Sequence, residues 1–342
     1  MNAALSPLPA NPQRTTAMNE MKTVTAADLA AVNGIHLIAQ VNSGGQRALD
    51  WAGANREDVE RLVQDNGALV LRGLKIPSSR DFGQILSVLF DGELLDYAYR
   101  STPRTELRGN VYTATEYHPS LTIPQHNESA YSNEWAMRIG FFCMLPAEIG
   151  GETPISDSRV LYQRLPESIR TRFEEKGLMY VRNYSDIDLP WSEVFQTTDR
   201  DEVERYCAAK AIEVEWVGAN GLRTRQRTTA AATHPVTGDK VWFNQAHLFH
   251  ISALEADVRD GLLNDLGEGN LPRNCYFGDG SALDGDELQA IRDLYDQTKI
   301  AFTWERNDLM LLDNMLYTHG RTPYSGERKV LVGMARAHNR AS

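Results

Sequence analysis

The chain has 342 residues, of which 42% are apolar, and it carries a formal net charge of −11. This composition is typical of a globular protein with a large core, and it excludes a disordered chain. The negative charge argues against nucleic acid as the main partner, because phosphate binding needs a basic surface. No apolar run reaches the roughly 20 residues that span a membrane, so no membrane association is predicted.

The N-terminal residues 1–25 are rich in Ala, Asn, Pro and Thr and lack the apolar core of a signal peptide. They are predicted to form a flexible leader. Residues 26–342 contain no internal repeat and no low-complexity linker, so a single domain is expected. Three widely spaced cysteines, Cys143, Cys207 and Cys275, indicate reduced thiols and a cytoplasmic location rather than a disulfide framework.

The first elements along the chain alternate between helical and extended patterns. Residues 55–65 and 78–89 are predicted to be helices, and the apolar run at 68–73 between them is predicted to be a buried strand. Ser78 and Asp81 resemble a helix-capping pair at the start of the second helix.

Strands are more frequent in the rest of the chain. Strands are predicted at 137–145, 241–244, 302–304, 309–313 and 328–336. Helices are predicted at 165–176, 199–210 and 285–297. The second of these helices belongs to a helical insertion at about 185–230. Because strands and helices do not alternate regularly, the pattern favours a mainly β fold with peripheral helices, an antiparallel double sheet of the jelly-roll type (a cupin-like double-stranded β-helix).

The segment Gln125-His126-Asn127-Glu128-Ser129 alternates like a strand, which places His126 and Glu128 on one face. An imidazole and a carboxylate two residues apart can bind one metal ion, but two protein ligands are too few. His319, near the C-terminus, is the best candidate for the third. Two histidines and one carboxylate with the remaining positions open form the ligand set of non-haem Fe(II) oxygenases. A jelly roll can bring these distant segments together.

Four other histidines compete as ligands on residue type alone. His118 precedes a proline and is interpreted as part of a loop or pocket wall. The other three are interpreted as turn or core residues: His234, His247 and His250.

Several motifs, taken together and in this order, resemble the Fe(II)/2-oxoglutarate dioxygenases of the taurine dioxygenase (TauD/TfdA) family. The resemblance covers about residues 60–338. The motifs are Arg72-Gly73-Leu74, His126-Asn127-Glu128, Gly150-Gly151-Glu152-Thr153, Thr233-His234-Pro235-Val236-Thr237-Gly238, Trp242-Phe243-Asn244, Asp313-Asn314 and His319-Gly320-Arg321. They are most similar to the branch that tailors amino acids in peptide-antibiotic pathways, such as the syringomycin aspartate hydroxylase.

The resemblance implies that His126, Glu128 and His319 bind Fe(II) and that 2-oxoglutarate and O2 are cosubstrates. It also implies that Thr153 hydrogen-bonds the far carboxylate of 2-oxoglutarate. Halogenating relatives lack the carboxylate ligand, so Glu128 speaks against halogenation.

The arginine that pairs with 2-oxoglutarate is less clear, because the family position aligns with Val332. Arg328 and Arg336 flank this position on the same face, about 26 Å apart at roughly 3.3 Å per residue, so only one of them can serve. Related carnitine-pathway hydroxylases favour Arg328, although it could also be a solvated turn charge. Arg321 is a further candidate for this contact.

The implied reaction is hydroxylation of an amino acid, free or tethered to a carrier protein, with desaturation and cyclisation as alternatives. A non-catalytic metal-binding jelly roll is the competing class. Five polar or aromatic residues are candidates for substrate binding: Tyr112, Glu116, Asn127, Tyr131 and Asn244. The arginines of 223–227 could dock an acidic carrier or form a solvated face. A homo-oligomer is a further alternative to a monomer.

Overall fold

The fold was analysed in a computed structural model, which describes residues 24–32, 35–96, 105–107, 109–114, 117–184 and 189–340. The expected leader lies outside the described residues except at its end, because strand β1 already begins at Val24. Glu116, one of the predicted substrate-binding residues, also lies outside them.

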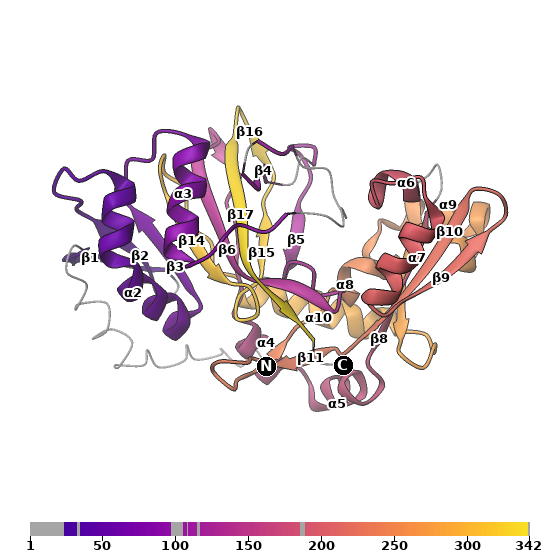
Figure 1. The fold of residues 1–342 in the computed structure, drawn as a ribbon. Helices are drawn as coiled ribbons and strands as arrows, with labels where there is room; N and C mark the ends of the chain where they lie inside the picture. The colour runs from indigo at the N-terminus through magenta and orange to yellow at the C-terminus, as the bar shows by residue number, and fades with distance from the viewer. Residues whose placement is uncertain are drawn as a thin grey trace, which may run out of the picture.

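A seven-stranded sheet forms the centre of the molecule (Figure 1). Its strands, in spatial order, are β1 (Val24–Val32), β2 (Ile35–Val41), β3 (Ala68–Arg72), β14 (Leu309–Asp313), β6 (Glu134–Leu145), β17 (Lys329–Asn339) and β4 (Val111–Thr113). β2 and β3 run parallel, whereas the other neighbours are antiparallel. The sheet is therefore mixed, and not antiparallel throughout as the sequence pattern suggested.

Helices α2 (Ala48–Asn66) and α3 (Ser79–Leu89) cover one face of this sheet (Figure 1). The Ser78 hydroxyl accepts a hydrogen bond from the Asp81 backbone N–H, as the capping pair predicted. The apolar side chains of α3 are buried against the strands because they recur at helical spacing.

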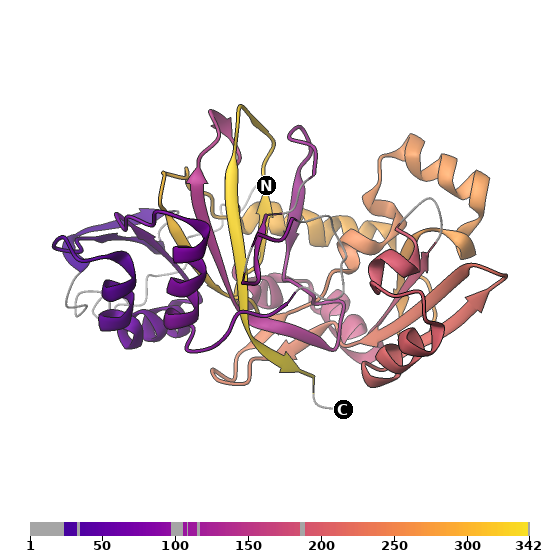
Figure 2. The ribbon, with the colours of Figure 1, turned by 45° about the horizontal axis from the view of Figure 1, so that its top comes forward.

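Short two-stranded ladders lie over the other face of the sheet (Figure 2). They pair β5 (Ile123–His126) with β15 (His319–Arg321), β7 (Ile149–Gly150) with β16 (Tyr324–Ser325), and β11 (Ala231–Thr233) with β12 (Lys240–Trp242). The β5–β15 ladder joins segments almost 200 residues apart in sequence, and it carries the site described below.

The insertion at about 185–230 is only partly helical, which corrects the sequence-based expectation. It contains α6 (Trp191–Val194), α7 (Arg200–Ala209), β9 (Ile212–Val217) and β10 (Gly221–Thr228). The β9–β10 hairpin extends a second sheet in the order β13-β8-β10-β9, with β8 at Leu178–Tyr184 and β13 at Arg273–Phe277. In Figure 1 this part projects to the right of the central sheet.

The remaining helices are α4 (Ser158–Arg164), α5 (Glu167–Lys176), α8 (Ala246–Phe249), α9 (Ala256–Leu266) and α10 (Gly285–Thr298), with 3-10 turns at Ile251–Ala253 and Glu268–Asn270. Residues 302–304 form no strand, although Phe302 and Trp304 are buried. Their apolar character reflects core packing rather than a place in a ladder. Of the helices described, none is long and apolar enough to cross a membrane.

Candidate active site

The β5–β15 ladder places His126 opposite His319, and their ring centroids are 4.5 Å apart. Glu128 follows two residues after His126, and its Oε2 lies 3.8 Å from His319 Nε2. One ligand atom from each of the three residues falls within 4.8 Å of the others. The structure therefore brings together the three residues that the sequence suggested as ligands.

Backbone contacts fix the His126 imidazole in a form that can bind a metal. Its Nδ1 lies 2.8 Å from the carbonyl oxygen of Pro124. A carbonyl only accepts hydrogen bonds, so Nδ1 carries the proton and Nε2 of the neutral ring keeps its lone pair. Two imidazoles and one carboxylate with this arrangement fit Fe(II), because this donor set is the facial triad of non-haem iron sites.

None of the competing histidines joins this cluster. His234 Nε2 bonds to Asp313, and His247 Nε2 bonds to the Gln125 carbonyl. His118 and His250 bond to nearby serine hydroxyls in their own loops. The interpretation of these four as loop, turn or core residues is confirmed.

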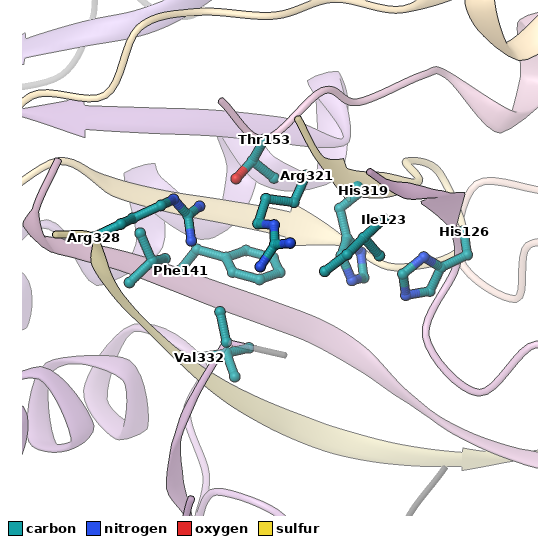
Figure 3. Close-up of a pocket in the computed structure, with 11 residues that line it drawn as sticks. Ile123, His126, Phe141, Thr153, His319, Arg321, Arg328 and Val332 are labelled. Carbon is teal, nitrogen blue, oxygen red and sulfur yellow. The ribbon is translucent and has the colours of Figure 1, made fainter. Parts of the chain in front are cut away.

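A pocket extends from the two histidines to a cluster of polar side chains (Figure 3). Arg321, Arg328 and Thr153 line its far part, and it encloses roughly 400 Å³ with its open mouth included. Phe141 and Val332 supply apolar walls between the two ends. The arrangement suits a small anion that contacts the histidines at one end and guanidinium groups at the other.

The Arg328 guanidinium is one of two arginine charges that line this pocket, with Arg321. Its Nε donates to the Gly151 carbonyl at 2.9 Å, and no carboxylate lies within 4.0 Å of its nitrogens in the described part of the chain. Burial lowers the pKa of Arg328 to about 10, and the nearby Arg321 guanidinium acts in the same direction. An anionic ligand would relieve both effects.

The Gly150-Gly151 turn explains why Arg328 can lie there. Gly151 has a φ of +74°, and a Cβ on it would come within 2.9 Å of the Arg328 side chain. The backbone carbonyl can therefore approach the guanidinium closely only because residue 151 is glycine. The turn also presents Thr153, whose hydroxyl accepts from Trp304 Nε1 at 3.1 Å. The Thr153 proton is thus directed elsewhere and can be donated to a ligand.

Arg336 does not lie in this pocket, so its place among the cosubstrate-binding candidates is corrected. Its Nε donates to the Phe90 carbonyl at 2.8 Å, and one terminal nitrogen contacts Glu60 at 2.7 Å on the helix-covered face. Arg336 has a φ of +60°, which interrupts the alternation of β17. The expectation that Arg328 and Arg336 share a face assumed an unbroken strand.

Three of the predicted substrate-binding residues have structural partners instead. The Tyr112 hydroxyl donates to Asp96, and the Asn244 amide donates to the Ala230 carbonyl. The Asn127 amide donates to the Asn314 carbonyl at 2.6 Å. All three side chains are buried, and none lines the pocket.

Tyr131 is placed differently, because it lines a second cavity together with Ser129, the residue after Glu128. Trp135, Tyr206 and Asp96 also line it, and it encloses roughly 750 Å³ with its open mouth included. No motif in the sequence links these side chains to one another.

Tyr324 is a residue beside the pocket arginines that no sequence motif marks. Its ring centroid lies 5.1 Å from the Arg321 guanidinium carbon and 5.6 Å from that of Arg328. Its aromatic face stabilises two neighbouring cations. The only signal in the sequence is its position between the two arginines.

Because His247 is buried, we expect the free energy of unfolding to depend on pH. Burial lowers its pKa to about 3, from 6.5. Between these values the unfolded chain binds a proton that the folded chain does not, so stability falls as pH drops below about 6.5, by at most about 1.4 kcal/mol per pH unit. Chemical denaturation at pH 7, 6 and 5 measures this loss. His247→Gln, which keeps a donor for Gln125, is expected to show a weaker dependence, and parallel curves would contradict the assignment.

Known proteins similar in sequence share most of the chain's length. Residues 37–335 match the family described as taurine catabolism dioxygenase TauD, TfdA family. The dapdiamide synthesis protein DdaC of Enterobacter agglomerans is 39% identical over 277 residues, which cover 81% of this chain and 84% of that protein. A clavaminate synthase-like protein of Arabidopsis thaliana is 31% identical over 291 residues, with coverage of 81% and 84%.

Solved structures with the same fold are more distant in sequence. PvcB from Pseudomonas aeruginosa is 14% identical and superposes with a TM-score of 0.52 over 87% of this chain and 84% of that one. Another structure of PvcB, described as an Fe, alpha-ketoglutarate dependent oxygenase from an isonitrile synthetic pathway, gives a TM-score of 0.53 at 14% identity, with coverage of 89% and 88%. These likenesses concern the fold alone.

Proposed function

Because the chain belongs to the TauD/TfdA family and is an Fe(II)- and 2-oxoglutarate-dependent dioxygenase, we propose that it hydroxylates an unactivated C–H bond of an amino acid or an amino-acid derivative in secondary metabolism. The observation that carries this proposal is one continuous pocket. At one end lie His126 and His319 beside Glu128, and at the other lie Arg328 and Thr153.

In this assignment His126, Glu128 and His319 hold Fe(II). Bound iron and 2-oxoglutarate supply the oxidation: one atom of O2 enters the substrate as a hydroxyl group, and the other enters succinate as CO2 is released. Arg328 pairs with the far carboxylate of 2-oxoglutarate, and the Thr153 hydroxyl donates to the same group. Phe141 and Val332 exclude water between the two ends. The role of the protein is to bind and orient the reactants.

We also propose that the fold is a double-stranded β-helix. We take the seven-stranded sheet and the β5–β15 and β7–β16 ladders as the two walls of a jelly roll. The metal ligands come from one wall, and Val330 and Val332 of β17 face them from the other. This arrangement supports the double-stranded β-helix because a ligand site between two walls is what that fold provides.

We place the amino-acid substrate in the second cavity, next to Glu128. Ser129 connects this cavity to the metal ligands, while Tyr131 and Trp135 give it aromatic walls. The Asp96 carboxylate at its edge is partnered by the Tyr112 hydroxyl at 2.8 Å. A carboxylate in this position suits the ammonium group of an amino acid.

Tyr131→Ala is expected to raise the KM of the substrate at least about 5-fold, since truncating a buried aromatic contact typically costs 1 kcal/mol or more. It should leave the Fe(II) affinity unchanged, because Tyr131 contacts no metal ligand in this proposal. Steady-state kinetics and metal titration measure both quantities. Tyr276→Ala, which removes a tyrosine of β13 outside the cavity, is the control. An equal rise in KM in both variants would contradict the placement.

A free amino acid is favoured over a carrier-tethered one. The arginines suggested for carrier docking already have acidic partners: Arg223 and Arg225 contact Glu215 at 3.3 and 2.7 Å, and Arg227 contacts Glu213. The two carboxylates offset two of the three positive charges, which leaves one net charge for an acidic carrier. A homo-oligomer and a cytoplasmic location stay predictions.

Mass spectrometry of an amino-acid pool tests the proposal. The pool is incubated with the protein, Fe(II), 2-oxoglutarate and O2. We expect one product that gains a single oxygen, formed only when 2-oxoglutarate is present. A product that lacks two hydrogens would indicate desaturation or cyclisation instead. No succinate with any substrate would favour a non-catalytic metal-binding protein.

A further inference from the structure

We propose that Asn314 is a positioning residue of the metal site, whose side-chain amide fixes the backbone of Glu128 and so sets where its carboxylate meets the two imidazoles. This inference rests on the proposed function, because it assigns a role within the same iron site. Asn314 lies five residues before His319 and does not itself belong to the ligand cluster.

The Asn314 amide makes three hydrogen bonds, and two of them hold Glu128. Its Oδ1 accepts from the Glu128 backbone N–H at 2.7 Å, and its Nδ2 donates to the Glu128 carbonyl at 2.9 Å. Nδ2 also donates to the Ala136 carbonyl at 2.9 Å. A backbone N–H only donates and a carbonyl only accepts, so the orientation of the amide follows from these partners. Asn314 is fully buried, and both of its amide protons are used.

The backbone at Glu128 needs this support because the regular ladder has already ended. The β5–β15 pairing stops at the His126–His319 pair, two residues before Glu128. The next residue, Ser129, has a φ of +58°, so the chain turns there. The paired N–H and C=O bonds to one side-chain amide replace the two bonds that a neighbouring strand would make.

Asn314 is itself fixed by its own backbone. Its N–H donates to the Met137 carbonyl at 3.0 Å, and its carbonyl accepts from the Asn127 amide at 2.6 Å. Asn127 and Glu128 are adjacent, so the two segments are joined by side-chain and backbone bonds in both directions.

The turn that carries Asn314 also leads to His319. Its first residue, Asp313, accepts from the backbone N–H groups of Met315 and Leu316 at 3.0 and 3.1 Å. The other oxygen of Asp313 is held by Arg138 and His234. One fixed turn therefore links the Glu128 backbone to the strand that presents His319, which couples the positions of two ligands.

Asn314→Asp tests this role with little change of shape. The carboxylate can still accept from Glu128 N–H, but it loses both donated bonds and faces two carbonyl oxygens. Asn274→Asp is the matched control: Asn274 is equally buried, on β13, and its amide accepts from Ile251 and Cys275 and donates to Tyr276. Asn314→Ser, which removes the reach to Glu128 without burying a charge, is the second variant.

The readout is Mn(II) affinity, measured from the electron paramagnetic resonance signal of free Mn(II), together with the unfolding midpoint of each variant. We expect both Asn314 variants to bind Mn(II) about 10- to 100-fold more weakly than wild type, the range typical of residues that orient metal ligands. Asn274→Asp should bind Mn(II) with wild-type affinity, even if its unfolding midpoint falls by as much as the midpoints of the Asn314 variants.

Two results would overturn the inference while leaving the proposed function intact. One is wild-type Mn(II) affinity in a folded Asn314 variant. The other is an equal loss of affinity in Asn274→Asp, which would mean that binding only follows stability. A wild-type protein that binds no Mn(II) and no Fe(II) would overturn both the inference and the proposed function.

Discussion

Arg328→Ala is expected to raise the dissociation constant of 2-oxoglutarate at least about 100-fold, equal to a loss of about 2.7 kcal/mol in binding free energy. Arg328 is a pocket guanidinium with no carboxylate within 4.0 Å among the described residues, and burial lowers its pKa to about 10. Removing it would leave the far carboxylate of 2-oxoglutarate without its charge-assisted hydrogen bonds, a change that typically costs 2–5 kcal/mol. Arg328→Lys should recover only part of the affinity, because an ammonium cannot form the bidentate contact.

Arg336→Ala is the matched control for this experiment. Arg336 contacts Glu60 and the Phe90 carbonyl on the helix-covered face, so its loss should lower stability and leave 2-oxoglutarate affinity near the wild-type value. Isothermal titration with Fe(II) replaced by Mn(II) measures the affinity without turnover. A loss of affinity in the Arg336 variant alone would refute the assignment of Arg328.

His126→Ala and Glu128→Ala are each expected to abolish 2-oxoglutarate turnover and to reduce bound Fe(II) to well below one ion per chain. Loss of a residue that hydrogen-bonds to a metal ligand typically weakens metal binding by roughly 10- to 100-fold. Removing a ligand itself should weaken metal binding by more than this. The expected loss is large because the cluster offers three ligand groups among the described residues, and each variant removes one of them. Metal content after anaerobic loading and desalting, together with succinate formation, measures both effects.

His250→Ala serves as the control, since His250 bonds to Ser252 in its own turn and lies outside the cluster. It should retain bound iron and turnover. Full iron occupancy in His126→Ala, or its loss in His250→Ala, would show that the metal is held elsewhere.

The metal cluster could be predicted from sequence because its determinants are local. His126 and Glu128 lie two residues apart on one extended segment, so alternation alone places them on one face. His319 was a candidate third ligand by residue type, and the resemblance to a family supported the choice, but nothing local indicates that residues almost 200 positions apart pair across a ladder. The apolar spacing of α3 and its Ser78 cap were equally local, and both were confirmed.

Other features could not be predicted, because they depend on the contacts that each side chain makes in the folded protein. Asn127, Tyr112 and Asn244 are polar residues near the motifs, but each bonds to a buried protein group. Arg336 departs from strand alternation through one positive φ, which no residue type at that position signals. The hairpin in the insertion was missed because its alternating charged residues resemble a solvated segment.

The second cavity could not be predicted for the same reason. Asp96, Ser129, Tyr131 and Tyr206 come from four separate stretches of the chain, and none carries a motif. Only the folded arrangement brings them to one cavity, which Ser129 links along the chain to Glu128. The substrate is therefore the part of the function that the sequence defines least.

The most direct test of the central claim is turnover under ¹⁸O2 with the amino-acid pool, analysed by mass spectrometry. If His126, Glu128 and His319 support a 2-oxoglutarate-dependent dioxygenase, one labelled oxygen will appear in succinate and one in the hydroxylated product. Both labels should disappear in His126→Ala. Succinate formed without label, or a product whose new oxygen comes from water, would contradict the account.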